Sequence, residues 1–150
     1  MRKIFFLSIC YFAALICGSY TAAQNRKADS LLLLLKTDKE DTNKVNHLNK
    51  IGTEEAFTAL YDEAIAHAEQ ALKLSEKLNF GEGKAEALNL LGLIIMSRGD
   101  YVEAVKYYQR SLVEAKKVKS ISLEINASCN LAIVYYNQGN FPQSLTCLLS

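Results

Sequence analysis

The stretch that decides the fold runs from Ala85 to Leu112 and reads A-E-A-L-N-L-L-G-L-I-I-M-S-R-G-D-Y-V-E-A-V-K-Y-Y-Q-R-S-L. Apolar residues recur at helical spacing on both sides of Gly99-Asp100, which predicts two helices joined by a tight turn. Gly99 tolerates a positive φ, and the Asp100 carboxylate can cap the second helix. Gly92 costs about 1 kcal/mol relative to alanine inside a helix. We therefore expect Gly92 to allow a close backbone approach opposite Ala104.

The same pattern recurs at a spacing of 40 residues. Small residues stand at one position of each first helix, and aromatic residues open each second helix: Gly52, Gly92 and Ala132, then Tyr61, Tyr101 and Phe141. A fixed period of about 20–50 residues is typical of a solenoid, in which each unit buries its apolar face on the next. The sequence therefore predicts an all-α fold of stacked helical hairpins.

This run of small, aromatic and Gly-Asp-Tyr positions resembles the tetratricopeptide repeat (TPR) family, clearly over residues 85–112 and 125–149 and more weakly over 45–72. The usual period of that family is about 34 residues, and we interpret the additional length as a longer second helix plus a linker. The resemblance implies a right-handed TPR-like α-solenoid. Its units are a capping helix and linker (24–44), repeat 1 (45–84), repeat 2 (85–124) and a truncated repeat 3 (125–150).

The N-terminus has the three-part layout of a secretory signal peptide. Arg2-Lys3 is positively charged, Ile4 to Cys17 is an apolar run, and small residues precede Gln24. This run is shorter than the roughly 20 residues that a membrane span needs. We expect residues 1–23 to be a signal peptide and the protein to be periplasmic or on the outer face of the inner membrane. An uncleaved anchor and a lipoprotein signal at Cys17 are the alternatives.

Three further segments carry structural expectations. Leu31–Leu35 are expected in a short helix that covers the open end of repeat 1, because terminal repeats need a cap. The stretch Phe80–Gly83 is interpreted as a linker. Leu145, Leu148 and Leu149 have no following helix to cover them, so we expect this sequence to be the N-terminal part of a longer chain.

No motif for chemistry stands out. His47 and His67 lie twenty residues apart without a Cys/His cluster, so no metal site is expected. No carboxylate pair is forced into one apolar cleft and no nucleophile elbow is present, so we expect no catalytic residue, no cofactor and no enzyme activity here. After residues 1–23 the acidic and basic side chains nearly balance, which argues against a nucleic-acid partner.

The resemblance also places a candidate site. In stacked hairpins of this family the first helices line a groove that holds peptides, and side-chain amides can bond a peptide backbone through donors and acceptors. The groove candidates are Asn46, Asn49, Thr53 and Phe57 in repeat 1, Glu86, Asn89, Leu93 and Met96 in repeat 2, and Asn126, Cys129, Ile133 and Tyr136 in repeat 3. A merely solvated inner wall, or one filled by further repeats of the same chain, is the alternative. We expect Asn49→Ala with Asn89→Ala to leave helical content and melting nearly unchanged but to weaken the binding of a peptide.

The function that follows is an exported module that binds a protein or peptide along this groove, with membrane contact only through the signal peptide or a downstream span. The start of the chain, with K-A-D-S-L-L at 27–32 and E-D-T-N-K-V at 40–45, resembles exported TPR proteins of Bacteroidetes type. In that group such arrays often precede a membrane helix and a histidine kinase or DNA-binding domain. The alternative is therefore a periplasmic sensory input domain.

Overall fold

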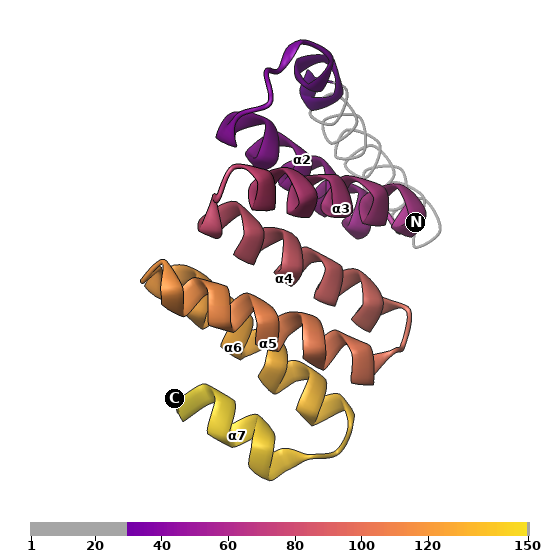
Figure 1. Cartoon of the computed structure of the whole chain (residues 1–150). Coiled ribbons are helices and arrows are strands. Elements are labelled where there is room, and N and C mark those ends of the chain that lie inside the picture. Colours follow the sequence, from indigo (N-terminus) through magenta and orange to yellow (C-terminus); the bar gives the residue numbers. More distant parts are fainter. Residues whose placement is uncertain (1–29, 150) are drawn as a thin grey trace, which may run out of the picture.

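The computed structural model describes residues 30–149, and within them it contains helices and no strand (Figure 1). Residues 30–37 are helical and precede six helices: α2 (Thr42–Phe57), α3 (Tyr61–Lys77), α4 (Gly81–Ser97), α5 (Tyr101–Lys117), α6 (Ile121–Asn137) and α7 (Phe141–Leu149). The expected signal peptide, residues 1–23, lies outside the described residues. The prediction of an all-α fold is confirmed.

The helices form three hairpins that stack on one another. Within a hairpin α2 packs on α3, α4 on α5 and α6 on α7. Between hairpins, α4 contacts both α2 and α3, and α6 contacts both α4 and α5 (Figure 1). Each hairpin therefore covers an apolar face of the one before it, which is the predicted TPR-like solenoid.

A left-handed residue ends a helix every twenty positions. The residues with positive φ are Ala59 (60°), Asn79 (53°), Gly99 (88°), Lys119 (57°) and Gly139 (74°). Each of these residues lies in a turn with the pair of backbone hydrogen bonds typical of a Schellman motif. At Gly99, for example, the Gly99 N–H donates to the Met96 carbonyl oxygen (2.9 Å) and the Asp100 N–H donates to the Ile95 carbonyl oxygen (3.2 Å), and the other four turns have the equivalent bonds. The helices α3 to α6 therefore all have 17 residues.

This equal division corrects two expectations. The additional length of the repeat is not confined to the second helix, because α4 and α5 are equally long. Phe80–Gly83 is not a linker, because Asn79 makes the turn and α4 begins at Gly81. Gly81 serves packing instead, because a Cβ there would clash with Cγ1 of Val118.

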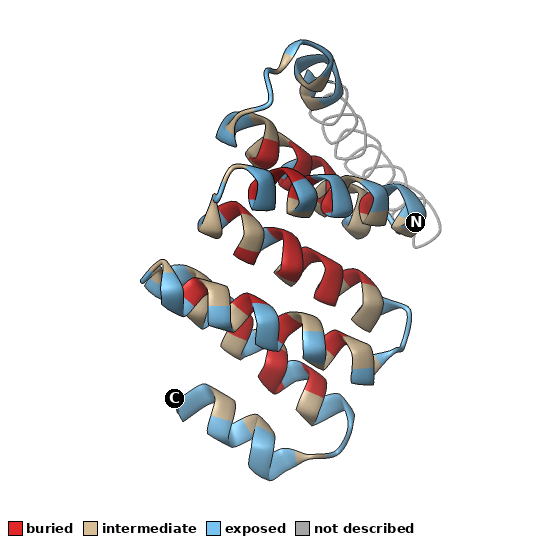
Figure 2. Cartoon of the chain, in the orientation of Figure 1, coloured by how far each residue is buried: buried red, intermediate tan, exposed pale blue. Residues whose placement is uncertain are grey.

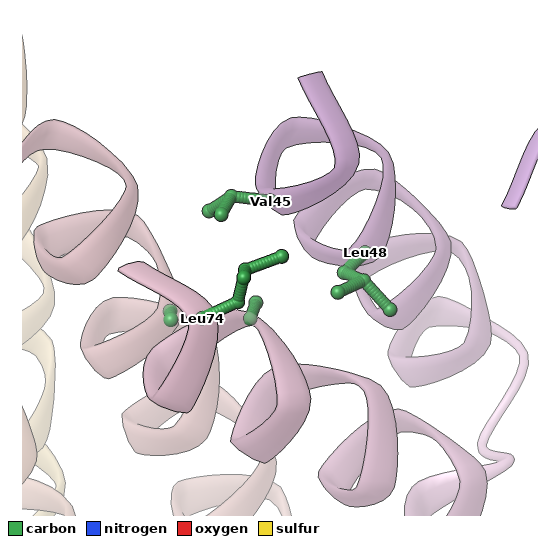
Figure 3. Close-up of a cluster of buried hydrophobic side chains, with 5 residues drawn as sticks. Val45, Leu48 and Leu74 are labelled. Carbon is green, nitrogen blue, oxygen red and sulfur yellow. The ribbon is translucent and has the colours of Figure 1, made fainter. Parts of the chain in front are cut away.

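Buried side chains concentrate along the interfaces between helices, most densely on α4 (Figure 2). One cluster contains Val45, Leu48 and Leu74 from the first hairpin (Figure 3) together with Ala87 from α4. The last hairpin is the least buried, since α7 has no buried residue. As expected, the leucines of α7 are exposed: Leu145, Leu148 and Leu149.

Two glycines inside first helices allow neighbouring side chains to approach. A Cβ on Gly52 would lie 2.8 Å from Leu90 Cδ2 and 3.2 Å from the carbonyl oxygen of Ala64. A Cβ on Gly92 would lie 2.7 Å from the ring of Tyr108, which is fully buried. The Tyr108 ring, one helical turn beyond Ala104 on α5, therefore lies nearest to Gly92, and the close approach of Gly92 to Ala104 stays a prediction.

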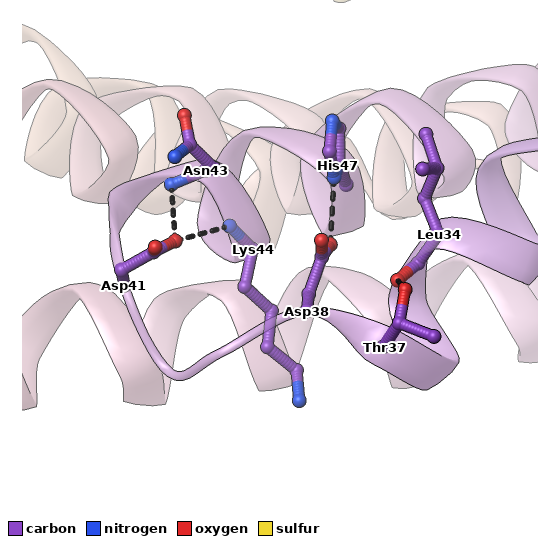
Figure 4. A network of polar contacts seen from close by, with 7 residues as sticks. All are labelled: Leu34, Thr37, Asp38, Asp41, Asn43, Lys44 and His47. Atoms are coloured by element: carbon purple, nitrogen blue, oxygen red, sulfur yellow. Dashed lines mark hydrogen bonds and ion pairs between the residues drawn. The ribbon is translucent and has the colours of Figure 1, made fainter.

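The junction before α2 is held by polar contacts (Figure 4). The Asp41 carboxylate accepts from the backbone N–H groups of Asn43 (2.9 Å) and Lys44 (3.2 Å), and so caps α2. His47 Nδ1 lies 2.6 Å from Asp38 Oδ2. Of the expected capping leucines, Leu35 packs on the first core cluster, whereas Leu32, Leu33 and Leu34 remain exposed.

The left-handed turns yield a stability prediction. Ala59 is exposed, and a left-handed conformation is strained for any residue with a Cβ, so we expect Ala59→Gly to raise the free energy of unfolding by about 0.5–1 kcal/mol. Gly99→Ala should lower it by about 1 kcal/mol, because a Cβ there meets no neighbour and only its φ of 88° opposes it. Urea denaturation followed by circular dichroism measures both, and equal effects of the same sign would contradict this account.

Candidate binding groove

A groove of about 560 Å³ crosses three helices. Every residue that lines it belongs to α2, α4 or α6, which are the first helices of the three hairpins. The lining residues are Asn49, Lys50, Thr53, Glu54 and Phe57 from α2, Glu86, Asn89, Leu90 and Leu93 from α4, and Leu123, Asn126, Cys129 and Asn130 from α6. The first helices thus present one continuous surface.

Most of the predicted groove residues meet there. The structure brings together these members of the predicted set: Asn49, Thr53, Phe57, Glu86, Asn89, Leu93 and Asn126, with Cys129 beside them. Four others lie elsewhere. Asn46 is half-buried one turn before Asn49, and Met96 packs against the core cluster that α5 and α6 share. Ile133 and Tyr136 are exposed, and the Tyr136 ring contacts Phe141 edge-on at 5.5 Å.

Sequence reasoning missed several lining residues: Lys50, Glu54, Leu90, Leu123 and Asn130. Asn130 is the most consequential, because its Nδ2 donates to Asn89 Oδ1 at 3.0 Å. It stands one residue beyond the position forty residues after Asn89, which Cys129 occupies. A search for amides within one residue of the repeat position would have found it.

Asn49 fixes the groove wall between α2 and α4. Its side chain is only 5% exposed, and its Nδ2 donates to the carbonyl oxygen of Gly83 (3.1 Å) and to Glu86 Oε2 (3.3 Å). Its Oδ1 is buried and has no hydrogen-bond partner within the described chain. Asn49 is therefore part of the helix packing as well as of the groove.

Glu86 is the carboxylate at the centre of this surface. Its side chain stays exposed on the groove wall, and partial burial of its carboxylate raises its pKa. The hydrogen bond from Asn49 and the positive charge of Lys50 act against that rise, whereas Glu82 adds to it. No cation forms an ion pair with Glu86 among residues 30–149.

Two other hollows each involve a single hairpin. One of about 320 Å³ lies between α4 and α5, and its Lys84 and Lys106 are ion-paired with glutamates. The other, of about 590 Å³, lies on the first hairpin and the residue Glu40 before it. Size does not separate these hollows from the groove. The groove differs because it joins three hairpins through uncharged polar side chains.

The other polar clusters have structural roles. His67 Nδ1 lies 2.7 Å from Glu55 Oε2 and so ties α3 to α2. No group of three His, Cys, Asp or Glu side chains in the described part of the chain could hold a metal ion. Among the described helices, none is long and apolar enough to cross a membrane.

Residues 83–149 match the family model described as Tetratricopeptide repeat. This part of the chain is similar to the tetratricopeptide repeat family. The match covers the second and third hairpins together with the end of the groove that α4 and α6 form. No curated protein sequence matches the chain.

Solved structures share the helical fold over most of the array. The TPR domain of Arabidopsis FLU is 21% identical with a TM-score of 0.63, over 69% of this chain and 87% of that one. BtubC (BKLC) from P. vanneervenii is 19% identical with a TM-score of 0.73, and the match covers 85% of this chain and 54% of that one. A Rap protein complexed with Competence and Sporulation Factor is also 19% identical with a TM-score of 0.73, over 83% of this chain and only 34% of that one.

The hydrogen bonds of Asn49 change the effect on stability that we expect from Asn49→Ala. Asn49→Ala deletes a buried hydrogen bond between α2 and α4, so we expect it to lower the free energy of unfolding by about 1 kcal/mol. Asn89→Ala should be nearly neutral, because the Asn89–Asn130 bond lies on a partly exposed wall. Urea denaturation of the single variants checks this. The double variant Asn49→Ala with Asn89→Ala should therefore be less stable than wild type, so it cannot test binding alone. Equal stability of Asn49→Ala and wild type would contradict this interpretation.

Proposed function

We propose that this chain is a non-enzymatic interaction module that binds an extended peptide or protein segment along the groove across α2, α4 and α6. The observation that carries the proposal is the convergence of side-chain amides from all three helices on one surface: Asn49, Asn89, Asn126 and Asn130. An amide supplies both donors and acceptors, as does a peptide backbone.

The amide pair at the centre leaves its outer groups free for a ligand. Because Asn130 Nδ2 donates to Asn89 Oδ1, the N–H groups of Asn89 and the carbonyl oxygen of Asn130 remain for a peptide backbone. Packed helices lie about 8–10 Å apart and an extended chain advances about 3.3 Å per residue. A segment of about seven residues therefore spans the three helices.

Apolar side chains between the amides offer positions for ligand side chains. Phe57 is 71% exposed at the end of α2, and Leu93 lines the groove on α4. An exposed aromatic ring is a common anchor in protein interfaces. Backbone hydrogen bonds would then supply general affinity, and these apolar contacts would supply selectivity.

The proposal is tested with a fluorescent library of random peptides of about seven residues, titrated against the 150-residue chain. We expect Asn89→Ala to weaken binding of the library about tenfold, because it removes hydrogen bonds to the ligand without unfolding the array. Fluorescence polarisation measures the affinity, and circular dichroism checks the fold.

Asn43→Ala is the matched control, since it removes an exposed amide from α2 outside the groove. It should bind as wild type does. If Asn89→Ala and Asn43→Ala bind equally well, the groove is not the binding surface.

We infer in addition that the module works outside the cytoplasm. The support is the charged start Arg2-Lys3, the apolar run Ile4 to Cys17 and the small residues before Gln24. Alkaline phosphatase, which is active only after export, reports on this when it is fused after Ser30.

The fusion should be active and should be shortened near Gln24. Phe12→Asp with Leu15→Asp interrupts the apolar run and should abolish the activity, because a signal peptide needs an uninterrupted apolar core. Immunoblotting of cell fractions measures the product length. An active but unshortened membrane product would establish an anchor instead, and an inactive wild-type fusion would contradict export.

A sensory input role is the second form of this proposal. It is supported by the resemblance of residues 27–32 and 40–45 to exported TPR proteins whose arrays precede a membrane helix and a histidine kinase or a DNA-binding domain. The coding DNA past Ser150 separates the two forms. A membrane span followed by a kinase-like or DNA-binding domain would support the sensor, and a frame that closes after a polar helix would support the free module.

A further inference from the structure

The groove carries an excess of acceptor groups at one point. Glu86 projects from α4, the central helix of the three, and forms no ion pair within the described chain. Directly behind it, Asn49 is 95% buried; its Nδ2 donates to Glu86 Oε2, and its Oδ1 has no hydrogen-bond partner among residues 30–149. The Glu86 carboxylate on the groove wall thus lies next to a buried amide whose oxygen is unsatisfied, and neither receives a charged donor from the described residues.

The charges around this point favour a cationic ligand. Glu54 and Glu86 line the groove against a single cation, Lys50, and Glu82 lies close enough to Glu86 to act on its pKa. The lining residues contributed by α6 are uncharged: Leu123, Asn126, Cys129 and Asn130. An acidic ligand would place a second hydrogen-bond acceptor beside the Glu86 carboxylate, which needs donors. An apolar ligand would remove water from this carboxylate without replacing the lost hydrogen bonds.

We propose that the groove selects a peptide with a lysine or arginine side chain seated on Glu86. This rests on the proposed peptide-binding function and names the ligand class of that site. An ammonium group has three N–H donors and a guanidinium five, enough to satisfy the carboxylate together with a neighbouring amide oxygen. Because Glu86 lies on the central helix, the cation comes from a side chain within the peptide, with its backbone running on both sides toward Phe57 and Asn126.

The test uses four pools of fluorescent peptides of about seven residues, the length that spans three helices. The pools are acetylated and amidated at their ends, carry uncharged random residues elsewhere, and hold lysine, arginine, glutamine or glutamate at the centre. Titrated against the 150-residue chain, the lysine and arginine pools should bind about tenfold more tightly than the glutamine pool, with the glutamate pool weakest.

Two matched variants assign the preference to one carboxylate. Glu86→Gln should reduce the preference to within about twofold while it keeps the affinity for the glutamine pool, because it removes the charge and retains the shape. Its melting temperature should not fall, since burial already disfavours the charge of Glu86. Glu63→Gln, which removes an exposed carboxylate from α3, should keep the full preference.

The outcomes separate this inference from the groove function. If the pools bind and Asn89→Ala weakens them, but lysine and arginine bring no gain, the cation site is overturned and the groove function stands. A preference that survives Glu86→Gln also overturns it. Equal binding by a glutamine pool with a free amino terminus would move the cation to the peptide end and overturn the side-chain form. Failure of all pools to bind would overturn the groove function and the cation site together.

Discussion

The structure depends on a backbone constraint, a left-handed turn that closes after every twentieth residue. Because each turn captures the last carbonyls of the helix before it, the helices cannot drift in length, and residues forty apart occupy equivalent places on successive hairpins. The turn does not depend on glycine. Ala59 and Lys119 adopt the same conformation at a cost of about 1 kcal/mol each, so the packing of the helices on both sides determines the backbone there.

Although equivalent residues are forty positions apart, the side chains that pack between the two helices of a hairpin differ from one hairpin to the next. In the second hairpin the ring of Tyr108 lies over Gly92. In the first hairpin Ala68 is at the equivalent place, and Leu90 reaches Gly52 from α4, the first helix of the next hairpin. The Tyr108 hydroxyl is buried without a hydrogen-bond partner in the described chain, and burial raises the pKa of this phenol far above its usual range. Tight packing at this seam is therefore achieved at the expense of one unsatisfied polar group.

How far the sequence predicts the molecule follows from the same register. Helix spacing, the turn at Gly99 and the cap at Asp100 depend on local chemistry, so the order of the residues is enough to predict them. The turns at Asn79 and Lys119 cannot be predicted in this way, since neither residue type demands a left-handed conformation, and Gly81, two residues after Asn79, favours a linker instead.

For the groove, the forty-residue period placed the amides of α2, α4 and α6 on one face. The period predicts the wrong position for a side chain where that position depends on contacts that differ from one repeat to the next. Met96 lies on the first helix of its hairpin as the other candidates do, but its side chain packs against the core cluster that α5 and α6 share. Asn130 joins Asn89 although it is one residue out of register, because its side-chain amide reaches from α6 to α4 and donates to Asn89 Oδ1. Asn49 has the character of a surface residue, but its bond to the Gly83 carbonyl makes it part of the packing. Three of the groove amides, Asn49, Asn89 and Asn130, are thus held in place before any ligand binds, which lowers the entropic cost of binding.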